Sequence, residues 1–304
     1  MVDFSNFPVG KAIQSEKGYW YRKLQDLGTG KNASTFLVVA TEGPHRGILF
    51  ALKVFQRLSS EESRQRFADE SRFLQANSHP AIMKVYDAGV FRDSAARYPF
   101  IVAEYLPFRL ADLIATKGVS TVEKISYAFQ LLSALAYLSG LDPPVIHRDI
   151  KPENILLKGK SCVLGDFGLM KRQGPIASDD QQILRQSTGA AMPSRYRTPD
   201  LVAYARGEEP ITCASDVFQL GIVLAELFVG INPIQPADDV LAPVTMEQIA
   251  QIPGALGASV ASMIRRMLRH NPADRPSVHE LQDNWQSAFL EAAEQANKQN
   301  GWVV

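Results

Sequence analysis

The sequence predicts an α+β fold with two lobes, the first built mainly from strands and the second mainly from helices. Apolar runs of strand length fill about the first hundred residues, and longer segments with a helical period of apolar residues begin near Leu110. A chain of 304 residues is long enough to bury two separate cores. We therefore expect a first lobe over residues 1–104 and a second over residues 105–304.

In the first lobe, turn signals such as Gly28-Thr29-Gly30 and Gly43-Pro44 separate the apolar runs. The strands predicted there are Tyr19–Leu27, Ser34–Thr41, Ile48–Gln56, Met83–Phe91 and Phe100–Glu104. A helix that ends near Ala76 is predicted after the third of these strands, because Ser59 and Glu62 have the spacing of a capping box.

The second lobe is predicted to be helical because apolar residues recur about every 3.6 positions in several of its segments. The predicted helices are Thr121–Leu138, Asp216–Val229, Ala258–Leu268 and Val278–Asn297. The stretch Met170–Ser194 is rich in Gln, Ser, Gly and Ala, and it is predicted to be a long exposed loop. Loops of that length inside a compact domain are usually functional.

The composition argues against several classes of protein. The 32 basic and 32 acidic side chains cancel, so the net charge favours neither nucleic acid nor an anionic membrane. The two cysteines, Cys162 and Cys213, cannot build a disulfide framework. The N-terminus lacks the pattern of a signal peptide, and the most apolar stretch, Val217–Ile234, is interrupted by polar residues. We expect a cytoplasmic protein with no membrane segment and no nucleic-acid partner.

The eight residues His147-Arg148-Asp149-Ile150-Lys151-Pro152-Glu153-Asn154 carry the strongest chemical signal. Phosphoryl transfer needs a carboxylate to accept the proton of the incoming hydroxyl, a cation near the moving phosphate, and a metal ligand close by. Asp149, Lys151 and Asn154 offer these three groups. An isolated Asp-x-Lys-Pro would be read as a polar turn, but eight consecutive residues that each fit a role favour the catalytic interpretation. A second carboxylate, Asp166, follows between glycines at the end of a short apolar strand.

A buried ion pair is predicted in the first lobe. Lys53 interrupts an otherwise apolar strand, and Glu70 shares the apolar face of the following helix with Phe67 and Phe73. Each residue alone could be a surface charge with a buried stem. Leaving a buried charge unpaired costs about 3–5 kcal/mol, so pairing Lys53 with Glu70 explains both positions.

These motifs resemble those of the Hanks-type protein Ser/Thr kinase family, and the compact second lobe is similar to that of bacterial members. The catalytic stretch resembles HRDxKxxN, Asp166-Phe167-Gly168 resembles DFG, and Ala51-Leu52-Lys53 resembles the A-x-K strand. The resemblance implies the bilobal kinase fold, Asp149 as catalytic base and Lys151 on the γ-phosphate. It also implies ATP as a cofactor and Mg²⁺ on Asn154 and Asp166, with Mn²⁺ as an alternative.

The resemblance extends to the nucleotide site. Leu27-Gly28-Thr29-Gly30 resembles the glycine-rich loop, although a lone Gly-x-Gly is as often a plain hairpin, and Ala33 and Thr35 depart from the family pattern. Phe100–Leu106 resembles the hinge, with Ala103 at the gatekeeper position, so we expect an accessible pocket behind the adenine. The implied nucleotide-binding residues are Leu27, Gly28, Gly30, Thr35, Ala51, Lys53, Ala103, Glu104, Leu106 and Leu156.

Residues 166–200 resemble the activation segment, which ends in a YxAPE-like stretch. Asp200 is expected to pair with Arg275, and Thr198 or Ser194 could replace a threonine that the family usually carries upstream. The resemblance implies that Arg148 and Lys171 gather a phosphate on this segment. Autophosphorylation at Ser187 and Thr188, in trans through self-association, is therefore predicted, the alternative being that these hydroxyls only solubilise the loop. Asp216 is expected to cap its helix, to hold the backbone of the catalytic loop, or to do both.

Three functions remain to be compared: an active protein Ser/Thr kinase, a catalytically inactive kinase-fold binding module, and a small-molecule kinase. An inactive module would be favoured by loss of a catalytic group, and all of these are present: Lys53, Asp149, Asn154 and Asp166. Small-molecule kinases usually lack a lysine at the position of Lys151 and lack the segment Tyr196–Asp200. The sequence favours the protein kinase and leaves its protein substrate open, because peptide specificity depends on surface grooves.

Overall fold

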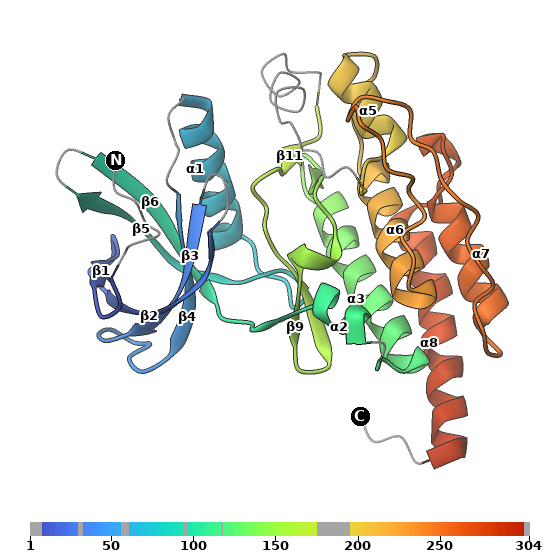
Figure 1. Cartoon of the computed structure of the whole chain (residues 1–304), viewed down its shortest axis with the longest axis horizontal. Coiled ribbons are helices and arrows are strands. Elements are labelled where there is room, and N and C mark those ends of the chain that lie inside the picture. The colour runs from blue at the N-terminus through green and yellow to red at the C-terminus, as the bar shows by residue number, and fades with distance from the viewer. Residues whose placement is uncertain are drawn as a thin grey trace. The chain divides into compact units, whose positions relative to one another are not determined.

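The computed structural model describes residues 8–29, 33–55, 61–93, 96–116, 118–174 and 195–300 (Figure 1). The chain divides into two compact units, Met1–Pro107 and Phe108–Val304. The division falls shortly after the lobe boundary predicted at residue 104. Among the residues just named, the first unit holds the larger sheet and one helix, and the second is mainly helical, which is the α+β arrangement that the sequence predicts.

The first unit contains an antiparallel sheet with the strand order β1-β2-β3-β4-β6-β5. Its strands are β1 (Ala12–Gln14), β2 (Trp20–Thr29), β3 (Ala33–Ala40), β4 (Leu49–Phe55), β5 (Val85–Asp93) and β6 (Ala96–Glu104). All five predicted strands are present with shifted ends. The three-residue strand β1 was not predicted, because so short a segment shows no alternation of apolar and polar residues.

The core of the first unit lies on one face of this sheet. In β3 and β4, buried residues alternate strictly with half-buried or exposed ones. The buried cluster consists of Ile13, Tyr21, Phe36, Val38, Ala40, Phe50, Leu52, Val54, Tyr98, Phe100 and Val102. The sheet curls around this cluster until its first and last strands meet, since the Glu16 N–H just after β1 donates to Ala88 O in β5 at 3.1 Å.

Helix α1 (Glu61–Ala76) packs on the other face of the sheet. The rings of Phe55 on β4 and Phe67 on α1 lie 4.6 Å apart between centroids. The proposed capping residue Ser59 lies outside the described residues. Glu70 is 2% exposed, so it lies on the packed face of α1 as the helical spacing predicts.

The second unit contains α2 (Leu110–Thr116), α3 (Thr121–Ser139), α5 (Pro199–Arg206), α6 (Ala214–Val229), α7 (Gly257–Met267) and α8 (Val278–Asn300). Its short strands are β7 (Phe108–Arg109), β8 (Val145–Ile146), β9 (Ile155–Lys158), β10 (Ser161–Leu164) and β11 (Lys171–Arg172). The four long helices were predicted within a few residues, and α3 begins at a capping box formed by Ser120 and Glu123. Helices α2 and α5 were not predicted because they are only about two turns long.

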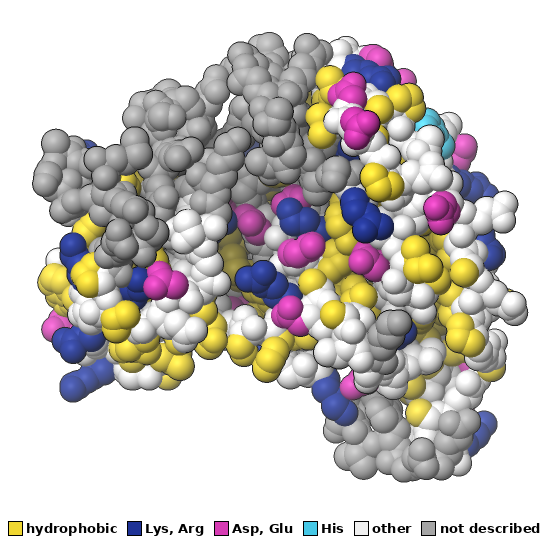
Figure 2. All heavy atoms as spheres, viewed as in Figure 1, with side chains coloured by type: hydrophobic (Ala, Val, Ile, Leu, Met, Phe, Trp, Pro, Cys, Tyr) yellow, Lys and Arg dark blue, Asp and Glu magenta, His cyan; other side chains and the backbone are white. Residues whose placement is uncertain are grey.

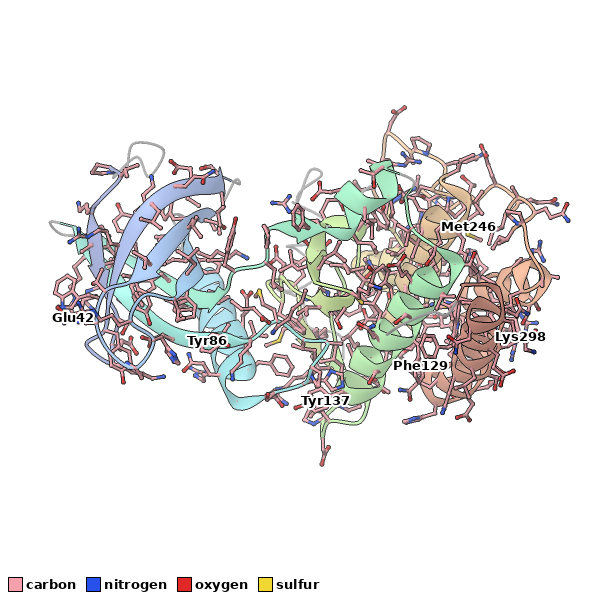
Figure 3. The ribbon with its side chains drawn as sticks, turned by 90° about the horizontal axis from the view of Figure 1, so that it is seen from below. Glu42, Tyr86, Phe129, Tyr137, Met246 and Lys298 are labelled. Atoms are coloured by element: carbon pink, nitrogen blue, oxygen red, sulfur yellow. The ribbon has the colours of Figure 1, made fainter. Side chains whose placement is uncertain are left out.

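Helices α3, α6 and α8 enclose the core of the second unit. Trp285 on α8 is fully buried against Phe228 of α6, with 6.0 Å between ring centroids. Phe129 of α3, labelled in Figure 3, stacks on Phe289 of α8 at 6.4 Å. Of the helices that the structure describes, none is long and apolar enough to cross a membrane.

Charged side chains of both signs are interspersed on the face of the molecule that Figure 2 shows. Figure 2 shows Lys and Arg side chains beside Asp and Glu side chains over the face in view. This distribution agrees with the zero net charge of the sequence.

Candidate active site

The predicted catalytic residues lie in a loop that follows strand β8. Pro152 begins a short 3-10 helix, Pro152–Asn154, because proline suits the first helical position, where no N–H bond is needed. Strand β9 starts directly afterwards at Ile155. The turn therefore brings Asn154 back toward Asp149.

The Asp149 carboxylate is held from two sides. Lys151 Nζ lies 2.9 Å from each carboxylate oxygen. The amide nitrogen of Asn154 donates to Asp149 Oδ2 at 2.8 Å and to Asp149 O at 2.9 Å. These contacts fix the position of the carboxylate, and they leave the side-chain oxygen of Asn154 as the atom that could bind a cation.

Burial raises the pKa of Asp149 to about 6, against the opposing effect of Lys151. Its carboxylate is therefore ionised at neutral pH and more basic than an exposed aspartate. A base with a pKa near the working pH combines the required charge state with useful proton affinity. This is the property that a proton acceptor at a reacting hydroxyl needs.

The hairpin of β9 and β10 brings the second predicted metal ligand to the same loop. Ile155 pairs with Leu164, so Asn154 and Gly165 are neighbours at the open end of the hairpin, where Gly165 N–H donates to Asn154 O at 2.8 Å. Asp166 follows Gly165 and has a left-handed φ of 57°. A non-glycine residue in this region is strained and often marks a functional position.

His147 connects the same two segments. Burial lowers its pKa to about 4, so the ring is neutral at pH 7. Its Nε2–H donates to Gly165 O at 3.0 Å, because a carbonyl can only accept, and Nδ1 accepts from the backbone N–H of Asp149 at 3.3 Å. The ring also packs edge-on against Phe167 at 4.5 Å.

Asp216 holds the backbone of the loop that carries Asp149. Its carboxylate accepts hydrogen bonds from the N–H groups of His147 at 2.8 Å and Arg148 at 2.9 Å. Burial raises the pKa of Asp216 to about 7, and these two donors oppose the increase. The capping alternative is wrong, because the residue at the N-cap position of α6 is Cys213.

Arg148 itself has a left-handed φ of 67°, a conformation that costs about 1–3 kcal/mol in a non-glycine residue. Its Nε donates to Leu169 O at 2.6 Å. Lys171, the second predicted regulatory cation, begins β11 and pairs with Ile146 in the strand that leads into the loop. Ser187 and Thr188 lie outside the described residues. The binding of a phosphate by Arg148 and Lys171 therefore stays a prediction.

The expected ion pair at the end of the activation segment is present. Arg275 Nη1 lies 2.9 Å from Asp200 Oδ1, and both side chains are buried. Arg275 also donates to the carbonyls of Ala214, Arg269 and His270. Thr198 is fully buried and caps α5 by accepting from Leu201 N at 2.9 Å. This structural role makes Thr198 a poor replacement for the missing threonine.

In the first unit, the register of the sheet brings five of the ten predicted nucleotide-binding residues together. Gly28 lies opposite Thr35, Thr35 opposite Lys53, and Ala51 opposite Ala103. Because opposite residues share a face, these five positions line the face away from the aromatic core. Gly30 lies outside the described residues.

The other predicted nucleotide-binding residues do not belong to this set of opposite positions. Leu27 belongs to β2, Glu104 ends β6, Leu106 follows it, and Leu156 lies in β9 of the second unit. Lys53 Nζ lies 5.2 Å from the centre of the Phe55 ring, on the face where α1 packs. The ion pair between Lys53 and Glu70 stays a prediction.

Sequence reasoning missed one residue of the second unit, Gln219. No role was assigned to it from the sequence, where it interrupts the apolar stretch Val217–Ile234. It lies three residues after Asp216 on α6, and this spacing is the one signal that could have identified it, because residues three apart share a helix face.

Known proteins resemble this chain over most of its length. The protein kinase domain family matches residues 21–286. The chain is 28% identical to the carbon catabolite-derepressing protein kinase of Candida glabrata, over 94% of this chain and 48% of the relative. It is 30% identical to the protein of the same name from Saccharomyces cerevisiae, over 87% and 40%. It is 30% identical to the serine/threonine-protein kinase PknB of Mycobacterium tuberculosis, over 69% and 33%. The chain thus spans less than half the length of these relatives.

Proposed function

Because this chain belongs to the protein kinase domain family, and to its Hanks-type Ser/Thr branch, we propose that it transfers the γ-phosphate of ATP to Ser or Thr hydroxyls of a protein. One observation carries the proposal most directly. The Asp149 carboxylate is fixed by Lys151 and Asn154, and the backbone of Asn154 is bonded to Gly165 next to Asp166.

Asp149 is the proposed base. It accepts the proton of the acceptor hydroxyl as the oxygen attacks the γ-phosphorus and the bond to the β-phosphate oxygen breaks. Lys151 holds the carboxylate in place and offers positive charge where the transferred group gains negative charge. His147 and Asp216 act on this reaction only through the backbone of the loop.

Family membership implies a divalent cation together with ATP, and we propose Mg²⁺ with Mn²⁺ as a substitute. The side-chain oxygen of Asn154 and the carboxylate of Asp166 are hard oxygen ligands, which suit Mg²⁺. When bound, the cation neutralises charge on the phosphates. The amide nitrogen of Asn154 orients the ligand oxygen through its two bonds to Asp149.

We also propose which residues bind the nucleotide. In the first unit, Lys53 is proposed to bind the phosphates and to pair with Glu70, which is already buried on α1. The adenine is proposed to contact Ala51, Ala103 and the backbone of Glu104 and Leu106. The other proposed contacts are Leu27, Gly28, Gly30, Thr35 and Leu156.

Regulation by autophosphorylation belongs to the same proposal. A phosphate on Ser187 or Thr188 would meet the cations Arg148 and Lys171, and opposite charges of this kind order a loop. A double alanine variant at these two positions should lower both activity and bound phosphate, and unchanged values of both would contradict this role. Self-association during the reaction and a cytoplasmic location also stay predictions.

The function can be tested by offering three classes of acceptor. The chain is incubated with γ-labelled ATP and Mg²⁺, together with a pool of Ser/Thr peptides, a set of amino sugars and choline, or no acceptor. We expect label on Ser and Thr residues of peptides and of the chain itself. Label on the small molecules alone would indicate a small-molecule kinase, and nucleotide binding without transfer would indicate a binding module.

A matched variant identifies the atoms responsible. Asp166→Asn should abolish transfer, because an amide is a weaker cation ligand than a carboxylate. Asp283→Asn is the control, since Asp283 is an exposed aspartate on α8. Equal loss in both variants would contradict the role of Asp166.

A further inference from the structure

Gln219 is a fully buried polar residue in the middle of α6. Its side-chain oxygen accepts from the backbone N–H of Ile150 at 2.9 Å. Its side-chain nitrogen donates to Arg148 O at 2.9 Å and to Tyr196 O at 3.0 Å. A single amide therefore joins two segments that are distant in sequence, the catalytic loop and the end of the activation segment.

The chemistry of the three partners fixes the orientation of this amide. Ile150 offers an N–H, which can bond only to an acceptor, whereas the carbonyls of Arg148 and Tyr196 can bond only to donors. A flipped amide would break all three hydrogen bonds at once. The two loop contacts also lie on either side of Asp149, so they hold both peptide groups that flank the proposed base.

Gln219 and Asp216 both bind the backbone of Arg148, the residue with the left-handed φ. They are three positions apart on α6 and so share a helix face. Asp216 accepts from the N–H of Arg148, and Gln219 donates to its carbonyl, so side chains of α6 bind both polar backbone groups of Arg148. A left-handed φ at a non-glycine residue persists only where the surroundings determine it, and these two contacts supply that constraint.

The third bond, to Tyr196, adds a connection that Asp216 does not make. The Tyr196 hydroxyl is also bound to α6, because it donates to Glu226. The backbone and the side chain of Tyr196 are thus both tied to the helix that holds the catalytic loop. A displacement of Tyr196 would therefore pull on the side-chain nitrogen of Gln219. The same nitrogen donates to Arg148 O, so the movement would reach the loop that carries Asp149.

We infer that Gln219 is a positioning residue that couples the end of the activation segment to the Asp149 loop. This inference rests on the proposed function, since positioning is measured through phosphate transfer. It predicts that loss of the amide disturbs the residues around Asp149 and the residues around Tyr196 together. It also predicts slower transfer with nucleotide affinity retained.

The test compares Gln219→Leu with Gln130→Leu. Gln130 is a matched control because its amide also serves structure: it accepts from Cys162 N at 2.9 Å and donates to Ser126 Oγ at 2.9 Å. The readouts are kcat and KM for a Ser/Thr peptide, the Kd for ATP, and amide hydrogen exchange in peptides that cover residues 147–154 and 195–201. Each variant is assayed at a temperature where circular dichroism shows it folded.

We expect kcat of Gln219→Leu to fall about 10- to 100-fold, since a small misplacement of a catalytic group has an effect of that size. The Kd for ATP should change less than about twofold, and exchange should accelerate in both peptides. In Gln130→Leu, kcat should stay within about twofold of wild type. A kcat for Gln219→Leu no lower than that of the control, or faster exchange in the catalytic-loop peptide alone, would overturn the inference.

A second variant keeps the test decisive if Gln219→Leu does not fold. In Gln219→Glu the new side chain keeps an oxygen that accepts from Ile150 N–H, and while its carboxyl is protonated it has one O–H that can donate to a carbonyl. This donor is lost as pH rises, so the ratio of the variant's kcat to that of wild type should fall with increasing pH. A ratio that does not depend on pH would contradict the inference. Absence of transfer by the wild-type chain would instead contradict the proposed function.

Discussion

The backbone N–H of Arg148 donates a 2.9 Å hydrogen bond to the carboxylate of Asp216, across 68 residues of sequence. The same carboxylate accepts from His147 N at 2.8 Å. Asp216 is 2% exposed, so no bulk water can replace it for these two donors. The conformation of the residue before the proposed base therefore depends on a side chain of a distant helix.

Replacing this carboxylate should affect both stability and rate. Asp216→Asn keeps one acceptor but turns an amide donor toward one of the two N–H groups. We expect the free energy of unfolding to fall by about 1.5–3 kcal/mol, the range for a hydrogen bond to a charged group, and kcat to fall at least tenfold. Urea denaturation and steady-state kinetics at pH 8, above the Asp216 pKa of about 7 so that the carboxylate is ionised, measure the two effects.

The control for this change is Asp112→Asn. Asp112 also accepts a backbone N–H, from Arg109 at 3.0 Å, but at the exposed start of α2. We expect a loss below about 1 kcal/mol there and no change in kcat, because exposed hydrogen bonds are replaced by water. Similar losses in the two variants would argue against a special role for Asp216.

Acid should destabilise the fold through His147. The pKa of this ring is about 4 in the folded protein and 6.5 in its ordinary state, so the unfolded chain binds more protons between these values. The contribution of His147 is therefore fully present above pH 6.5 and is lost as pH falls toward 4, at up to ~1.4 kcal/mol per pH unit. Protonation would also turn Nδ1 into a donor that faces the N–H of Asp149.

The comparison that isolates this effect is wild type against His147→Gln in urea denaturation from pH 7.5 to 5. The stability advantage of the wild type should shrink as pH falls, because the variant cannot titrate at this position. An advantage that stays constant over the range would contradict a buried, neutral His147.

The buried pair of Asp200 and Arg275 should respond asymmetrically to truncation. Arg275→Ala removes the partner of a buried carboxylate and also frees three carbonyls that the guanidinium binds. Asp200→Ala leaves Arg275 with those three carbonyls. We expect a loss of about 3–5 kcal/mol for Arg275→Ala and a smaller loss for Asp200→Ala in urea denaturation. The reverse order would contradict the importance of the carbonyl contacts.

A larger residue at the gatekeeper position should reduce inhibitor binding. Ala103 lies opposite Ala51 in the sheet and is 4% exposed, so a methionine there would extend into the space that a bulky adenine-site inhibitor needs. Ala103→Met should weaken such an inhibitor at least tenfold, because even one methylene group in an apolar pocket changes binding by about 10- to 200-fold. The KM for ATP should change less than about threefold, since ATP does not need that space. Unaltered inhibition would contradict the predicted back pocket.

The sequence predicts the fold to the extent that local patterns encode it. Long helices such as Thr121–Ser139 are predictable because a period repeated over several turns outweighs single residues. The strand Ala12–Gln14 and the helix Pro199–Arg206 are not predictable, because segments this short do not repeat a pattern of apolar residues. Their position depends on tertiary contacts, such as the ion pair of Asp200 with Arg275.

The site divides in the same way. Asp149, Lys151 and Asn154 are close in sequence, so their spacing predicts that their side chains meet. The hairpin of β9 and β10 then returns the chain to Asn154, which brings Gly165 and the following Asp166 to the same loop. The role of Asp216 stayed ambiguous because a cap and a long-range contact have the same local sequence. Gln219 was missed because its partners lie up to 71 residues away and leave no mark on the residues around it.

The most direct test of the proposed function is the rate of phosphate transfer from ATP to a Ser/Thr peptide by wild type and by Asp149→Asn, under the same Mg²⁺ concentration. The variant keeps the size of the side chain but loses the base, so kcat should fall about 10²- to 10⁴-fold while the Kd for ATP stays nearly constant. Phosphoserine or phosphothreonine should be the labelled product. Transfer by Asp149→Asn within tenfold of the wild-type rate would contradict the role of Asp149 as the catalytic base.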